Sequence, residues 1–333
     1  MPVIVNSENK HPFLPSLDSV AAIDKKRAET QDIRPLEIAI INLMADKQTT
    51  ERQLALWLGH TPLQVKLTFA ATDSYVLDVR NGRETTHTPT EHIRKFYSAW
   101  SDIKGNKYDG LIVTGVNALK SRVENEDIWP EVKKIFEWSK TNVFSSLFLC
   151  WGAKAALKHF YEIDSYKRNE KLWGVFPHFS ESDQTGLLFG FPDVFHIPVS
   201  RWKEPRRIDI ENCAALEIVA DSKEAGPNII VESGLNSSGV LFPYHLFVLG
   251  HPEYDTDTLR QEYERDHQNN TARRVPAHYF PEDDAGKKAL NNWRSCAHVY
   301  TNWVHAVYEA TPYDLVHTPL LRRAIKEDQC LCG

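Results

Sequence analysis

The pattern of hydrophobic and polar positions changes near Pro35. Residues 1–35 are polar and interrupted by prolines, which predicts an N-terminal arm. Beyond that point, apolar runs of strand length alternate with segments in which the apolar residues recur at helical spacing. The runs predict strands at 37–45, 63–71, 109–115 and 143–149. The segments predict helices at 49–60, behind a threonine cap, and at 88–100, 129–140 and 151–161.

The pattern changes again after Lys171. Short apolar pieces separated by turn residues predict further strands at 187–191, 216–221, 228–233, 238–242 and 245–250. Two helices are predicted at 256–268 and 288–309. Repeated strand–helix units favour an α/β fold with a mostly parallel sheet flanked by helices, and the later strands favour an antiparallel elaboration in the C-terminal half. We therefore expect a single α/β domain over 36–310 and a polar tail over 311–333.

Composition narrows the class of protein. The chain has 333 residues, 42% of them hydrophobic and 25% charged, which is typical of a globular protein. A formal charge of −6 makes nucleic acid an improbable partner. No apolar run reaches the roughly 18 residues that a membrane span needs, and the N-terminus does not look like a leader. We therefore expect a cytoplasmic protein that binds no membrane, with its five cysteines reduced.

Cys150 is the first candidate for chemistry. It lies where a buried strand is predicted to run directly into a helix. Such a thiol would sit at the carboxyl edge of the sheet, and the helix N-terminus would stabilise its thiolate. The backbone N–H of Trp151 would be free to bind a developing oxyanion. Many free cysteines are merely small buried hydrophobic residues, so the segment alone leaves both interpretations open.

His251 and Glu253 supply what a cysteine nucleophile needs. They follow an apolar run in the segment "FVLGHPEYD". Residues i and i+2 of an extended chain face the same side, so the imidazole and the carboxylate can point together towards the sheet edge. A base and its orienting acceptor are the partners that activate a thiol. The pattern favours a Cys150–His251–Glu253 triad.

Several segments of this sequence resemble those of one enzyme family. They include "IRPLEIAIINLM", "DGLIVTG", "LFLCWGAKAAL", "GHPEYD", "QEYERD" and "TPYDL", in the family's order from about residue 33 to 315. The family is the homoserine O-acyltransferases of methionine biosynthesis, of the homoserine O-succinyltransferase type. The resemblance implies a class I glutamine amidotransferase-like, flavodoxin-like fold. It also implies an acyl-CoA co-substrate and no tightly bound cofactor or metal.

The resemblance assigns roles to individual residues. It places the acyl group on Cys150, with His251 as base and Glu253 as its partner. It assigns substrate binding to Lys171, Ser200 and Arg265. A guanidinium at Arg265 makes chemical sense because an amino-acid acceptor carries a carboxylate that a planar fork can hold.

The chain departs from the family pattern in the loop expected above the nucleophile. Where the family has Thr-Gly-Ala-Pro, this chain has Thr114, Gly115, Val116 and Asn117, which changes the second oxyanion donor expected at Gly115 and Val116. At the position that discriminates donors, succinyl users carry Gly and acetyl users Glu, whereas this chain carries Leu119. An apolar Leu119 favours a short acetyl group. Lys120 and Arg122 are nearby cations that would instead suit succinyl.

Other interpretations stay open at this point. The changed loop would also suit L-serine or a related hydroxy amino acid as acceptor. A glutamine amidotransferase uses the same triad, although its elbow usually has Gly where this chain has Phe148. A non-catalytic protein on this fold is a third possibility, and a homodimer follows from symmetry base rates alone. Cys330 and Cys332 are predicted to belong to the C-terminal tail and not to a zinc site, because two ligands are too few to bind zinc.

Overall fold

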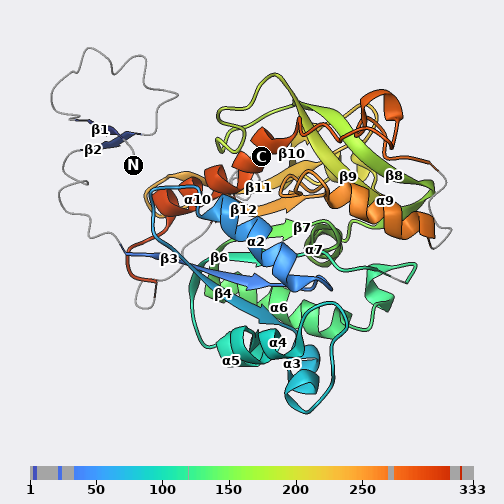
Figure 1. The fold of residues 1–333 in the computed structure, drawn as a ribbon. Coiled ribbons are helices and arrows are strands. Elements are labelled where there is room, and N and C mark those ends of the chain that lie inside the picture. The colour runs from blue at the N-terminus through green and yellow to red at the C-terminus, as the bar shows by residue number, and fades with distance from the viewer. Residues whose placement is uncertain are drawn as a thin grey trace.

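The computed structural model describes residues 34–118, 120–268 and 274–315. It also describes the backbone of three short strands, β1 (Val3–Val5), β2 (Ala22–Asp24) and β13 (Arg323–Ala324). Within these residues, the centre of the molecule is an 11-stranded sheet with the order β5-β4-β3-β6-β7-β12-β11-β10-β8-β9, and β13 pairs with β11 (Figure 1). Strands β1 and β2 pair in parallel, apart from this sheet.

One half of the sheet is parallel. Its strands are β5 (Ser98–Ala99), β4 (Val65–Ala71), β3 (Leu36–Ile41), β6 (Tyr108–Val113), β7 (Val143–Leu149) and β12 (Leu241–Val248). Each of these strands runs parallel to its neighbour within this half. Every residue of β6 and β7 is buried, because helices cover both faces. The predicted α/β fold with a parallel sheet is confirmed.

Alternate side chains of the central strands enter two hydrophobic layers. Ile38 and Ile40 of β3 pack with α2 (Lys47–Leu58) and α10 (His298–Ala310) on one face. Ala39 and Ile41 point to the other face, where α6 (Trp129–Asn142) and α7 (Trp151–Tyr161) lie. Successive side chains of a strand point to opposite faces, so each buried strand contributes to the hydrophobic core on both sides of the sheet.

The other half of the sheet is antiparallel, as predicted for the C-terminal part. It consists of β11 (Ile229–Leu235), β10 (Glu217–Asp221), β8 (Ser165–Ser180) and β9 (Val194–Pro205). Strands β8 and β9 form a long hairpin that bends back towards the centre, where Pro198 O accepts the N–H of His251 at 2.8 Å. The remaining helices are α3 (Asp73–Arg80), α4 (Thr90–Phe96), α5 (Trp100–Ile103), α8 (Arg207–Glu211) and α9 (Thr258–Gln268).

Several predicted elements differ from the structure. The strand predicted at 187–191 is a series of turns, and Asp183 accepts the backbone N–H groups of Leu187 and Leu188 there. The helix predicted at 88–100 ends at Phe96, where Tyr97 turns extended. The helix predicted from 288 begins only at Arg294, as a short 3₁₀ turn that leads into α10.

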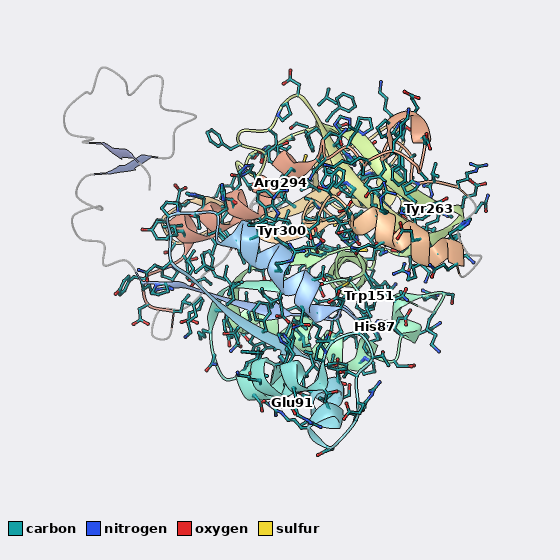
Figure 2. All side chains as sticks on the ribbon, viewed as in Figure 1. His87, Glu91, Trp151, Tyr263, Arg294 and Tyr300 are labelled. Carbon is teal, nitrogen blue, oxygen red and sulfur yellow. The ribbon has the colours of Figure 1, made fainter. Side chains whose placement is uncertain are left out.

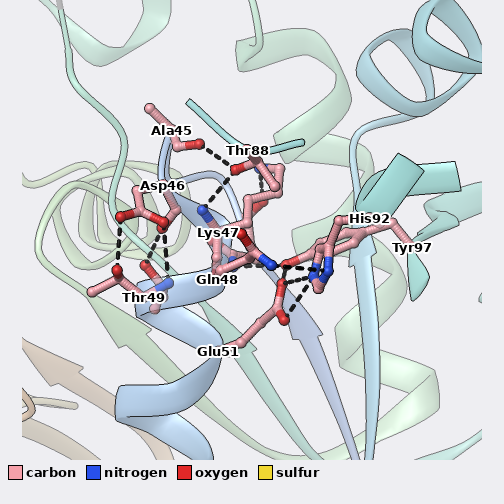
Figure 3. Close-up of polar contacts among 11 residues, drawn as sticks. Ala45, Asp46, Lys47, Gln48, Thr49, Glu51, Thr88, His92 and Tyr97 are labelled. Carbon is pink, nitrogen blue, oxygen red and sulfur yellow. Dashed lines mark hydrogen bonds and ion pairs between the residues drawn. The ribbon is translucent and has the colours of Figure 1, made fainter. Parts of the chain in front are cut away.

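The N-terminus of α2 is capped by Asp46, not by a threonine. Its carboxylate accepts the backbone N–H of Thr49 at 3.1 Å and the hydroxyl of that residue at 2.7 Å (Figure 3). Further along α2, Glu51 accepts hydrogen bonds from Tyr97 at 2.6 Å and contacts His92 at 2.9 Å (Figure 3). These contacts fix the helix at the carboxyl end of β3.

Arg34 ties the start of the described domain to its end. Its guanidinium holds both carboxylate oxygens of the buried Asp109, at 2.7 and 2.6 Å. The same guanidinium donates to the backbone carbonyls of Pro312 and Tyr313. The domain boundaries at 36 and 310 remain a prediction. None of the described helices is long and apolar enough to cross a bilayer.

Candidate active site

The pairing of two parallel strands brings Cys150 and His251 to the same edge of the sheet. Leu149 at the end of β7 lies opposite Val248 at the end of β12. The residues that follow these strands therefore leave the sheet side by side, at the carboxyl edge where open α/β sheets bind ligands. The backbone N–H of Cys150 donates to Val248 O at 2.8 Å, which locks the two strand ends together.

Cys150 forms a tight elbow between β7 and α7. Its backbone has φ 49° and ψ −106°, a conformation that residues with a Cβ rarely adopt. Cys150 is the single residue between the end of β7 and the start of α7, so its side chain lies at the sheet edge, next to the helix N-terminus. The thiol is partly buried, as expected for a nucleophile that is both shielded and reachable.

His251, Glu253 and Tyr300 form a hydrogen-bonded chain behind this thiol. Nδ1 of His251 lies 2.8 Å from Oε1 of Glu253, and the hydroxyl of Tyr300 donates to Oε2 at 2.6 Å. Only 5% of His251 and 6% of Glu253 are exposed. With Nδ1 committed to the carboxylate, Nε2 is left to face the Cys150 thiol, to which His251 is hydrogen-bonded.

The electrostatics of this pair favour a thiolate and an imidazolium. Burial alone would raise the pKa of Cys150, but the positive charges of Lys154 and His251 outweigh it and lower that pKa to about 6. Burial alone would lower the pKa of His251, but the charges of Cys150 and Glu253 raise it to about 10. At neutral pH the two groups therefore form an ion pair.

Gly115, one of the residues predicted to bind an oxyanion, lies next to Cys150 and Trp151. A Cβ placed on Gly115 would lie 3.3 Å from Cβ of Cys150 and 3.6 Å from the backbone N of Trp151. A side chain at Gly115 would thus crowd the backbone N–H of Trp151 beside the Cys150 thiol. Val116, the other residue predicted to contribute here, is partly buried against the core beneath α7.

The three predicted substrate-binding residues gather around two carboxylates of α9. The hydroxyl of Ser200 donates to Oε2 of Glu262 at 2.6 Å. Nζ of Lys171 lies 2.8 Å from Asp266 and 3.6 Å from Glu262. Arg265 pairs with Asp266 at 2.8 Å, and 62% of its side chain is exposed.

Tyr254 connects this cluster to the base. Its ring stacks on the imidazole of His251, with centroids 4.2 Å apart, and its hydroxyl donates to Glu262 at 2.9 Å. Sequence reasoning did not single out Tyr254 or Glu262, although both lie inside the quoted words "GHPEYD" and "QEYERD". Their position next to the predicted residues was the available signal.

Sequence reasoning also missed Tyr300, which carries no local signal of its role. Tyr300 comes from α10, far along the chain from Trp151 at the start of α7. Both residues are labelled in Figure 2, in the central part of the molecule. Leu119, Cys330 and Cys332 lie outside the described residues, so their predicted roles have no structural account. No group of three or more His, Cys, Asp or Glu side chains in the described ranges is arranged to hold a metal ion.

Comparison with known proteins identifies the family. The model of the family "Homoserine O-succinyltransferase" matches residues 2–313. This chain belongs to the homoserine O-succinyltransferase family. The homoserine O-acetyltransferase of Clostridium beijerinckii is 43% identical over 301 residues, covering 90% of this chain and 93% of that protein. That of Thermotoga neapolitana is 41% identical and covers 95% of this chain and 99% of the relative.

A solved glutamine amidotransferase from Thermotoga maritima has a TM-score of 0.47 and 13% sequence identity, covering 86% of this chain and 100% of that one. The family match decides between the enzyme classes that the triad left open. The protein is a homoserine O-acyltransferase of methionine biosynthesis, and its family implies an acyl-CoA co-substrate.

Proposed function

We propose that the protein transfers an acyl group from acyl-CoA to the hydroxyl of L-homoserine through a thioester on Cys150. The observation that carries this proposal is the buried chain from Cys150 through His251 to Glu253. A preformed thiolate attacks the donor carbonyl without first losing a proton. The neighbouring base then serves the second half of the reaction.

In the first half-reaction, Sγ of Cys150 forms a bond to the acyl carbon and the carbon–sulfur bond to coenzyme A breaks. The N–H of Trp151 and a donor from the Gly115–Val116 turn would stabilise the oxyanion. The coenzyme A thiolate leaves with the proton of the His251 imidazolium. The product of this step is a neutral acyl-enzyme with a neutral His251.

In the second half-reaction, neutral His251 removes the proton from the homoserine hydroxyl. The new carbon–oxygen bond forms and the bond to Cys150 breaks, which restores the thiolate and the imidazolium. The cluster on α9 suits a zwitterionic acceptor. Arg265 is exposed enough to take the carboxylate, and Glu262 and Asp266 are placed for the ammonium.

Trapping the acyl-enzyme tests this proposal. The purified protein is incubated with acetyl-CoA or succinyl-CoA in the absence of homoserine, and intact mass and peptide mapping locate the acyl group. We expect one acyl group on Cys150, which is lost when homoserine is added as the O-acyl product appears. The Cys213→Ala variant is the matched control, because Cys213 is a partly buried thiol away from the triad.

The Cys150→Ala variant should neither acquire mass nor turn over. Turnover by this variant, or an acyl group that maps to a different residue, would contradict the proposed mechanism.

A further inference from the structure

Two buried cations near Cys150 have been given no role so far beyond the effect of charge on its thiol. Lys154 follows Cys150 by one turn of α7, and only 8% of it is exposed. Among the described residues, its Nζ has one hydrogen-bond acceptor, the backbone carbonyl of Lys203 at 3.4 Å. An ammonium carries three donors and normally accepts distances near 2.9 Å, so this group is poorly satisfied.

Arg201 on β9 is the second cation, and 3% of it is exposed. Its Nε donates to Glu204 at 3.1 Å, and its Nη2 donates to the backbone carbonyl of Ala225. Its Nη1 is buried without a hydrogen-bond partner in the structure. Buried polar atoms are normally satisfied, so an unpartnered guanidinium nitrogen points to a missing acceptor.

Both cations act on the nucleophile. Lys154 and Arg201 each interact electrostatically with Cys150. They also come from neighbouring segments, because the carbonyl that Nζ of Lys154 contacts belongs to Lys203, two residues after Arg201 on β9. The nearest carboxylate, Glu204, also pairs with Arg168 and is therefore shared between two guanidinium groups. The space beside Cys150 has an excess of buried positive charge.

One of the two cations that the sequence suggested near Leu119, Arg122, is paired elsewhere. The guanidinium of Arg122 pairs with Glu124 and Asp164, at 3.3 Å in each case, on the outside of the molecule. The buried pair from α7 and β9 therefore replaces it as the cationic feature next to the acylated atom.

Acylation changes the charge balance of this space. In the resting enzyme the Cys150 thiolate offsets part of the positive charge. The thioester is neutral, so an acetyl-enzyme leaves Lys154 and Arg201 without that anion. Burial already lowers the pKa of Lys154, which shows how poorly this site tolerates an uncompensated ammonium. An acyl group with its own carboxylate would restore the balance.

We propose that Lys154 and Arg201 form a carboxylate-binding subsite for the donor, so that this enzyme prefers a dicarboxylic acyl-CoA, represented by succinyl-CoA, to acetyl-CoA. The proposal rests on the proposed function, because it concerns the acyl group that Cys150 carries. The distal carboxylate keeps its charge throughout both half-reactions. It accepts hydrogen bonds from Nη1 of Arg201 and Nζ of Lys154 and takes no part in bond breaking.

Donor competition tests the subsite. The kcat/KM values for succinyl-CoA and acetyl-CoA are measured with homoserine for the wild type, Lys154→Gln, Lys154→Arg and Lys158→Gln. Lys158 lies one turn further along α7, where it pairs with Glu162 and Asp164, and its variant is the matched control.

We expect the wild type to favour succinyl-CoA by about 10-fold or more, since a site built around buried donors rejects a substrate that leaves them unpaired. Lys154→Gln should lose about 10-fold more on succinyl-CoA than on acetyl-CoA, because both donors lose the effect of its charge on the thiolate but only succinyl-CoA loses a hydrogen-bond donor. Lys154→Arg should retain the preference, and Lys158→Gln should match the wild type.

Two outcomes would overturn the subsite. One is a preference of the wild type for acetyl-CoA, and this measurement does not depend on whether any variant folds. The other is an equal loss on both donors in Lys154→Gln, which would mean that Lys154 acts only by stabilising the thiolate. Both leave the acyl-enzyme mechanism intact. Failure of both donors to acylate Cys150 would instead refute the proposed function.

Discussion

Cys150 combines a strained backbone with a charged environment. A non-glycine residue at φ 49° and ψ −106° costs roughly 1–3 kcal/mol, which the surrounding strand and helix must supply. The strain aims the thiol at the sheet edge, where His251 and Lys154 carry positive charge. Geometry and electrostatics therefore act on the same sulfur atom.

The ionisation of this sulfur predicts a pH profile. The thiolate with a pKa of about 6 is present above that pH and is lost as the pH falls through it. Alkylation of Cys150 by iodoacetamide should therefore be near its plateau at pH 7.5 and fall by half near pH 6. An ordinary thiol, with a pKa of about 8.5, would still be gaining reactivity at pH 8. Mass spectrometry of the Cys150 peptide measures the rate.

The His251→Asn variant is the informative comparison. Without the imidazolium, the midpoint of the alkylation profile should move upwards by about one pH unit or more. An unchanged midpoint would mean that His251 does not contribute to the thiolate. Alkylation of Cys213, read from its own peptide in the same samples, provides the reference for a second thiol.

Tyr300 should matter because it anchors the carboxylate that orients the base. Tyr300→Phe removes the 2.6 Å hydrogen bond to Glu253 while keeping the ring. We expect kcat to fall by about 10-fold, since a hydrogen bond to a charged group contributes roughly 1.5–3 kcal/mol, with the KM for homoserine little changed. Steady-state kinetics measure both constants. A fall in thermal stability with unchanged kcat would assign Tyr300 a structural role only.

At the scale of residues, sequence spacing could predict Cys150, His251 and Glu253 as neighbours, because each follows a recognisable strand. The position of Lys154, one turn after Cys150 in the predicted helix, follows from helical spacing as well. Spacing could not predict Arg201 as a neighbour of the thiol, because Arg201 lies on β9 and its approach depends on tertiary packing that no local pattern encodes.

At the scale of elements, the close approach of α7 to β6 positions Cys150, the proposed nucleophile. Gly152 permits it, because a Cβ at this position would lie 2.5 Å from the carbonyl oxygen of Val113 and 2.8 Å from that of Thr114. The helix N-terminus therefore rests directly on the end of the neighbouring strand. A larger residue would push Cys150 away from its partners.

Gly152→Ala tests this packing. We expect the free energy of unfolding to fall by about 1–3 kcal/mol, as for other overpacked sites, and Cys150 to alkylate more slowly at pH 7.5. Gly105→Ala is the matched control, because a Cβ there meets nothing within 4 Å. Urea unfolding and the alkylation rate provide the two measurements. Equal stability of the two variants would show that α7 has room to move.

Among the strands, those with continuous apolar runs, such as β6 and β7, were predicted correctly. Strands β8 and β9 were missed because Pro177 and Pro198 interrupt their pattern, and a proline within a run argues against a strand. The apolar run at 187–191 resembled a strand but forms turns, with Gly190 at φ 82°.

At the scale of the whole molecule, the Arg34–Asp109 pair closes the described domain. Asp109 is completely buried in β6. The guanidinium of Arg34 pairs with both of its carboxylate oxygens and also donates to the backbone carbonyl of Pro312. This pair joins two segments that are distant in sequence.

The order of strands in the sheet could not be predicted either, because it depends on contacts between distant segments. The pairing of β7 with β12, for example, joins strands that many residues separate.

Removing Arg34 should be costly. Arg34→Ala leaves the buried carboxylate of Asp109 without its cation, and breaking such a pair typically costs about 3–5 kcal/mol. Urea unfolding measures this loss as a lower midpoint. Arg83→Ala is the matched control, because Arg83 pairs with Asp78 on the surface and should change stability by less than about 1 kcal/mol. Equal effects would mean that Asp109 is satisfied without Arg34.

The Tyr300–Glu253 hydrogen bond also orders events during synthesis. A chain made from its N-terminus exposes Cys150 long before His251 and Tyr300 have left the ribosome. Until α10 docks on the sheet, where Trp303 Nε1 donates to Ser145 at 2.9 Å, the triad has no anchored carboxylate. Because the charge of His251 contributes to the low pKa of Cys150, we expect the thiolate to be fully stabilised only late in synthesis. The reactivity of an elbow in the middle of the chain thus depends on residues close to its C-terminal end.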